Sequence, residues 1–146
     1  NRISDVSPLA SLTNLTELDL RKNQISDVSP LASLTNLTSL SIDSCQVSDI
    51  TPLASLTNLT WISLGNNQVH DITPLASLAY LTSLGLTDNR ISDIKPLLSL
   101  TELQLVNLMR NPLSLESIDV HVPDLESRGV KVVGRSSWRR RTASKR

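Results

Sequence analysis

The segment LTELDLRKNQISDVSPLASLTN, at residues 15–36, recurs along the chain with a period of 22 residues. One proline of the unit returns at Pro8, Pro30, Pro52, Pro74 and Pro96. An aspartate returns at Asp5, Asp27, Asp49, Asp71 and Asp93. An asparagine returns at Asn1, Asn23, Asn67, Asn89 and Asn111, with Cys45 in its place once. Three ladders with one period indicate a repeat protein, in which each unit buries its apolar face against its neighbours.

Each unit combines a strand pattern with a short helical pattern. Apolar and polar residues alternate around 18–20, which is typical of a half-buried strand, and the apolar residues of 28–34 follow helical spacing. Ser29 precedes Pro30, so we expect its hydroxyl to cap a helix that begins at the proline, a cap that Lys95 cannot supply. Because so short a unit leaves few residues for the return path, we expect a 3-10 or one-turn helix there.

The asparagine and aspartate ladders predict two kinds of turn. The asparagine follows the strand, where its amide can satisfy backbone groups that the turn leaves unpaired. Cys45 can be only a weak donor at that position, and we expect it to be a buried structural thiol. The aspartates should form Asx-type turns ahead of each helical segment.

The unit L-x-x-L-x-L-x-x-N matches the leucine-rich repeat signature. The fuller pattern N-x-I-S-D-x-S-P-L-A-S-L-T-N-L-T resembles the repeats of bacterial internalin-type proteins and is similar, less closely, to those of eukaryotic phosphatase-regulatory leucine-rich proteins. The resemblance covers residues 1–111 and implies an α/β leucine-rich repeat solenoid with a parallel concave sheet and short convex helical segments. It also implies a protein ligand and a secreted or surface-attached bacterial protein. Because the first unit begins partway through the repeat, we expect the chain to be a fragment.

Residues 112–133 depart from the repeat and predict a helix–strand C-terminal cap. Leu115, Ile118, Val122 and Leu125 have helical spacing, and Gly129 suits the residue after a helix. Val130 and Val132 should flank an outward-facing residue in a short strand. Residues 134–146 lack apolar periodicity, so we expect them to form a disordered basic tail.

Composition and charge separate an acidic body from this tail. The chain of 146 residues is 39% hydrophobic and 2% aromatic, which favours an aliphatic, stacked core. Residues 1–127 hold 6 Lys/Arg and 14 Asp/Glu, or 6 − 14 = −8, whereas 128–146 hold 8 basic residues and no acid. The tail could bind nucleic acid or an anionic surface, could fold back on the acidic body, or could be an unstructured terminus. No apolar run is long enough for a transmembrane segment.

The positions that should point outward from the sheet vary between units, and this variation indicates where a ligand would bind. The third strand position is occupied in turn by Glu17, Ser39, Trp61, Ser83 and Leu105. Trp61 stands alone among Ser and Thr, and tryptophan is enriched at binding hot spots. We therefore predict that Trp61 anchors a protein or peptide ligand. The further candidate ligand-binding residues are Glu17, Asp19, Arg21, Asp43, Leu105 and Met109.

Each of these candidates has an alternative interpretation. A single exposed hydrophobic residue such as Trp61 is common on protein surfaces. Leu105 and Met109 belong to the last unit and could instead pack under the cap or the tail.

The sequence predicts a binding module and not an enzyme. His70 and His121 have no nucleophile or carboxylate at a spacing that suggests a triad or a metal site, so we expect no catalytic residue, metal or cofactor. The leading prediction is a protein–protein interaction module that binds on its concave face. The alternatives are a structural spacer in a larger surface protein and binding of an anionic polymer through the tail.

Overall fold

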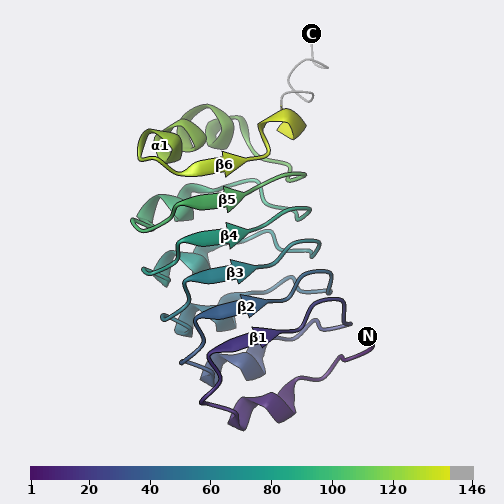
Figure 1. The fold of residues 1–146 in the computed structure, drawn as a ribbon. Helices are drawn as coiled ribbons and strands as arrows, with labels where there is room; N and C mark the ends of the chain where they lie inside the picture. The colour runs from purple at the N-terminus through teal and green to yellow at the C-terminus, as the bar shows by residue number, and fades with distance from the viewer. Residues whose placement is uncertain (139–146) are drawn as a thin grey trace.

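The computed structural model describes residues 1–138 and shows a solenoid of stacked units (Figure 1). One parallel sheet runs in chain order through β1 (Glu17–Asp19), β2 (Ser39–Ser41), β3 (Trp61–Ser63), β4 (Ser83–Gly85), β5 (Leu105–Asn107) and β6 (Lys131–Val133). Five-residue 3-10 helices lie behind it, at η1 (Ser7–Ser11), η2 (Ser29–Ser33), η3 (Thr51–Ser55), η4 (Thr73–Ser77) and η5 (Lys95–Ser99). The expected leucine-rich repeat solenoid is confirmed.

The strand register aligns equivalent residues of successive units. Glu17 pairs with Ser39, and Ser39 pairs with Trp61, so that equivalent residues of successive units form straight rows across the sheet. The central residue of the inner strands, such as Leu40 or Ile62, is fully buried. Because side chains alternate along a strand, the residues on either side of it form two rows on the solvent face.

The core is a stack of aliphatic layers. Its buried hydrophobic members are valine, isoleucine and leucine from every unit, joined by Trp138 at the C-terminal end. A unit of this kind has almost no apolar contacts of its own and gains them from the units above and below. Among the described residues, no helix has the length and hydropathy needed to cross a membrane.

The asparagine ladder ties each unit to the one before it. The Asn67 amide donates to the carbonyl oxygens of Ile42 in the preceding unit (2.8 Å) and of Leu64 in its own unit (3.1 Å). Its Oδ1 accepts the N–H of Val47 at 3.0 Å. Asn89 repeats the arrangement at 2.8 Å, 3.2 Å and 2.9 Å. The predicted role of the ladder follows directly from these bonds.

Cys45 supplies only part of this bonding. Its Sγ lies 3.5 Å from the Leu20 oxygen and 3.8 Å from the Asp43 oxygen, and the residue is half-buried. Ile25 is the equivalent of Val47 in the preceding unit. Its N–H has no amide oxygen to donate to, because Cys45 replaces the asparagine that would accept it.

The aspartate ladder forms the expected Asx-type turns and corrects the expected helix cap. The Oδ1 atoms of Asp27 and Asp93 accept the backbone N–H groups of Ser29 and Lys95, each at 2.8 Å. Ser29 is itself the first helical residue and makes no side-chain capping bond. The prediction of a hydroxyl cap was therefore wrong. Lys95 loses no capping bond relative to the serine or threonine of the other units, because the aspartate carboxylate accepts the N–H in every unit.

The C-terminal cap contains a widened helix. A π-helical turn, η6 (Ser117–His121), precedes α1 (Val122–Ser127), and the Val122 N–H donates to the Ser117 oxygen. Pro123 has no N–H, and its ring would clash with the carbonyl four residues earlier in a regular helix, which favours the wider turn. The turn shifts the helical phase, so that Ser117 and His121 are buried and Leu115, of the expected apolar stripe, is exposed.

The cap extends beyond its expected end at residue 133. Residues 135–138 form a helical turn, and Trp138 is 2% exposed and donates from Nε1 to the Leu108 oxygen at 3.3 Å. Arg135 forms a bidentate pair with Glu126 of α1, with Nε to Oε1 at 2.9 Å and Nη2 to Oε2 in contact. The expectation of disorder was therefore wrong for 134–138, and the rest of the basic tail, 139–146, lies outside the described residues.

Replacing Cys45 with asparagine should stabilise the protein. The amide restores a donor to Leu20 and an acceptor for the Ile25 N–H, and satisfying a buried group of this kind is worth about 1–3 kcal/mol. Chemical denaturation of wild type, Cys45→Asn and the control Cys45→Ala measures this directly. A Cys45→Asn variant no more stable than wild type would contradict the assigned role of the ladder.

Acid should weaken the solenoid through the aspartate ladder. Hydrogen bonds from the side chain and the backbone of Ser29 lower the pKa of Asp27, and the residue two positions on does the same for Asp5, Asp49 and Asp71. A lowered folded-state pKa gives stability that is present above the unfolded-state pKa, about 4, and is lost as pH falls through the folded-state pKa. The unfolding temperature should therefore decrease as the pH is lowered past about 4.

The isosteric variant Asp27→Asn keeps an acceptor for Ser29 and should show a shallower decline in this titration. Asp119→Asn, an exposed cap residue, controls for the loss of one charge. A decline in Asp27→Asn as steep as that of wild type would rule out the ladder as its source.

Trp138→Ala should destabilise the cap by about 3–5 kcal/mol, the usual cost of truncating a buried aromatic residue. Gly134 explains the tight fit, because a Cβ there would lie 2.6 Å from the Trp138 ring and 2.9 Å from the Met109 nitrogen. Hydrogen exchange of the β5 and β6 amides tests it, and unchanged protection of both strands would show that the tryptophan is not a cap residue.

Candidate functional site

The solvent face of the sheet carries the residues that vary between units. Trp61 extends from β3 and is 40% exposed, and the residues beside it in the row are Ser39 and Ser83. Because both neighbours are small, they leave part of the indole open to solvent. The core side of the same strand is filled by Ile62, and the neighbouring units hold serine at the position of Trp61.

A shallow groove connects Trp61 to the charged first strand. It is lined by Glu17, Leu18, Asp19, Arg21, Ser39, Ser41 and Trp61. The two regions of the sheet that the sequence indicated separately, the charged strand β1 and the lone tryptophan, are thus the walls of one groove. We call it the β1–β3 groove.

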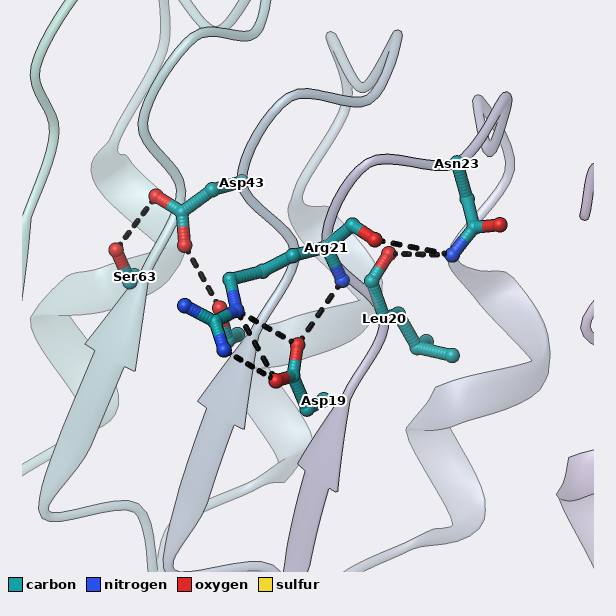
Figure 2. Close-up of polar contacts among 7 residues, drawn as sticks. Asp19, Leu20, Arg21, Asn23, Asp43 and Ser63 are labelled. Atoms are coloured by element: carbon teal, nitrogen blue, oxygen red, sulfur yellow. Dashed lines mark hydrogen bonds and ion pairs between the residues drawn. The ribbon is translucent and has the colours of Figure 1, made fainter. Parts of the chain in front are cut away.

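Within the groove, Asp19 and Arg21 form a closed ion pair (Figure 2). Arg21 Nε lies 2.9 Å and 3.0 Å from the two carboxylate oxygens of Asp19, and Nη2 lies 2.7 Å from Oδ2. The hydrogen bonds lower the pKa of Asp19 and raise that of Arg21. Both side chains are more than half exposed, so the pair adds little to stability, but it fixes where each charge lies.

Asp43 joins β2 to β3 beside the groove. Its Oδ1 accepts the Ser63 hydroxyl at 2.6 Å (Figure 2). The same oxygen accepts the Gly65 N–H at 2.8 Å, and Oδ2 accepts the Ser41 hydroxyl at 2.7 Å. A Cβ at Gly65 would lie 2.7 Å from the same Oδ1, which explains the glycine. As a site residue, Asp43 therefore presents a carboxylate that is already bonded within the sheet.

The remaining two candidates lie toward the cap. Leu105 is 37% exposed in the row of Trp61 but two strands away, which is about 10 Å. Met109 is half-buried, and its backbone nitrogen lies beside the turn at Gly134. Neither lines the β1–β3 groove.

Tyr80 is an exposed aromatic residue that the sequence reasoning did not select. It is 62% exposed and, with Thr60 and Thr82, lines a second hollow at the rim where the chain enters the strands. Tyr80 occupies the repeat position that Asn36 and Asn58 hold in the two preceding units. Each of these asparagines donates from its side-chain amide to a threonine carbonyl oxygen of the unit before it, at 2.8 Å. The break in this second asparagine ladder was the available signal.

The histidines lie apart from the groove. His70 is exposed. His121 is buried in the cap, with Nδ1 3.8 Å from Asp93 Oδ1 and Nε2 3.9 Å from Glu116 Oε1, distances beyond hydrogen-bond range. Residues 1–138 contain no group of three or more His, Cys, Asp and Glu side chains placed to hold a metal ion.

The repeats match a known family model. The model for leucine-rich repeats in pairs of copies matches residues 1–33, 13–55, 35–77 and 57–98. The chain therefore belongs to the leucine-rich repeat family. A search of curated proteins gives no match.

Solved structures define the type of repeat more closely. The chain is similar to internalin C2 of Listeria monocytogenes, with 46% identity and a TM-score of 0.82 over 90% of this chain and 56% of that one. Internalin F of the same organism shares 34% identity, with a TM-score of 0.66 over 90% of this chain and 44% of that one. The repeats are of the internalin type. A leucine-rich repeat protein of Leptospira interrogans, at 22% identity and a TM-score of 0.69 over 90% of this chain and 40% of that one, shares the fold.

The chain spans about half the length of the solved structures that it matches.

Proposed function

We propose that this protein binds a protein or peptide ligand on the solvent face of its sheet, with Trp61 as the central anchor. The observation that carries the proposal is the exposure of a tryptophan, flanked by two serines, on a face that the scaffold leaves free. Tryptophan buries a large apolar area at a small entropy cost and dominates many binding hot spots.

The surroundings of Trp61 support a ligand of protein-like size. The β1–β3 groove lies on one side of it, and the Tyr80 hollow adjoins through Thr60, the residue before Trp61. Apolar anchors surrounded by polar and charged residues are the usual composition of a protein interface. The rigid sheet holds these groups in place before the ligand arrives, which lowers the entropy cost of binding.

The proposal also includes where the protein acts and that it binds without catalysing a reaction. The internalin-type repeats favour a protein that acts outside the bacterial cell or on its surface, and a role in binding without catalysis. Leu105, at the far end of the row, would contact only a ligand that reaches two strands beyond Trp61.

A peptide selection tests the anchor. Peptides are selected from a displayed random library against the wild-type chain, and their affinities are then measured for Trp61→Ser, which restores the residue found in the neighbouring units. Loss of a hot-spot tryptophan should weaken binding about 10- to 30-fold, equivalent to roughly 1.4–2 kcal/mol.

The matched control is His70→Ser, which also restores a repeat residue, at an exposed position that does not line the groove. It should leave the affinities unchanged, and both variants should unfold at the wild-type temperature. Selected peptides that bind Trp61→Ser as tightly as wild type would refute the proposal.

A further inference from the structure

We infer that the β1–β3 groove receives an arginine side chain of the ligand, held between the Glu17 carboxylate and the Trp61 indole. The inference rests on the proposed function and specifies the chemistry of the partner: an extended segment that presents a guanidinium group to the sheet. It follows from the register of the sheet, the state of each charge in the groove and the shape of the row.

The register places the two groups on opposite sides of a gap. Glu17, Ser39 and Trp61 occupy one row on three neighbouring strands. Two strand spacings separate Glu17 from Trp61, or about 10 Å between their backbones. Ser39 forms the floor between them with a side chain too small to fill the space, and its hydroxyl is a further hydrogen-bond acceptor.

The charges leave Glu17 as the available carboxylate. The charge of Asp19 is compensated by its bidentate ion pair with Arg21. The Asp43 carboxylate is hydrogen-bonded to two serine hydroxyls and a backbone N–H. Arg21 acts electrostatically on Asp19 and on Asp43. Within residues 1–138, Glu17 forms no ion pair, and its side chain is exposed. The groove therefore offers one unpaired negative charge next to an aromatic wall.

A guanidinium group matches both walls. It is planar and weakly hydrated, stacks on aromatic faces and donates two parallel hydrogen bonds to a carboxylate. A cation within about 6 Å of an indole centroid is attracted by the ring, and tryptophan gives the strongest such interaction. An acidic side chain would be repelled by Glu17, and a purely apolar one would leave the carboxylate poorly solvated.

Nuclear magnetic resonance of the full chain tests the inference with a built-in reference. The two indole N–H signals belong to exposed Trp61 and to buried Trp138, which donates to Leu108, and Trp61→Ser assigns them. The probes are acetyl-Gly-Gly-Arg-Gly-Gly-amide and the same peptide with citrulline, which keeps the shape of arginine and removes its charge. The arginine peptide should shift the Trp61 signal and the Glu17 and Ser39 amides, with the Trp138 signal unchanged.

Glu17→Gln should raise the dissociation constant of the arginine peptide about three- to tenfold, and Asp119→Asn, which removes the same charge from the cap, should not. Equal responses to arginine and citrulline, or equal effects of the two substitutions, would overturn the inference. The proposed function fails separately. If Trp61→Ser still weakens binding of the selected peptides but arginine and citrulline act alike, Trp61 remains the anchor and only the arginine assignment falls.

Discussion

The hydrogen bonds of the asparagine ladder are the interaction on which the rest of the structure depends. Each strand is followed by a residue with positive φ, such as Asn66 at 55°, and the chain must then turn inward. The next side chain, Asn67, bonds the carbonyls that this turn exposes and also both a carbonyl and an N–H of the preceding unit. One residue thus closes its own turn and fixes the stacking distance to its neighbour, which keeps the leucine layers in contact.

Because this bonding lies inside the solenoid, the solvent face of the sheet is free of structural duties. The rows on that face can change residue by residue without disturbing a layer, as the series Ser39, Trp61, Ser83 shows. Asp43 is the exception, since its carboxylate joins two strands and lies where a Cβ at position 65 would meet it. Function can therefore arise on this face by few substitutions, and departures from the repeat are where it should be sought.

The fold was predictable from the sequence because its determinants repeat, whereas features that occur once were not. The period and the ladders specify strand order, register and core. The Ser29 hydroxyl and the Asp27 carboxylate could both satisfy a helix N-terminus, and the sequence alone does not show which one does. Trp138 was hidden because a single aromatic residue in a basic segment has no periodicity, and its partner Leu108 is 30 residues distant. The replacement of the repeat asparagine by Tyr80 is visible in the sequence, but no charge or motif around it indicates a function.

The site was predictable as a set of residues but not as an arrangement of charge. The sequence selected Glu17, Asp19, Arg21 and Asp43 as candidates but did not show which of their charges are paired. The structure divides them: two neutralise each other, and one is bonded within the sheet. That division is what distinguishes Glu17, across the groove from Trp61, because a carboxylate attracts a partner strongly only where its charge is not already compensated. The specificity of such a face is therefore set as much by the internal pairing of its charges as by their number.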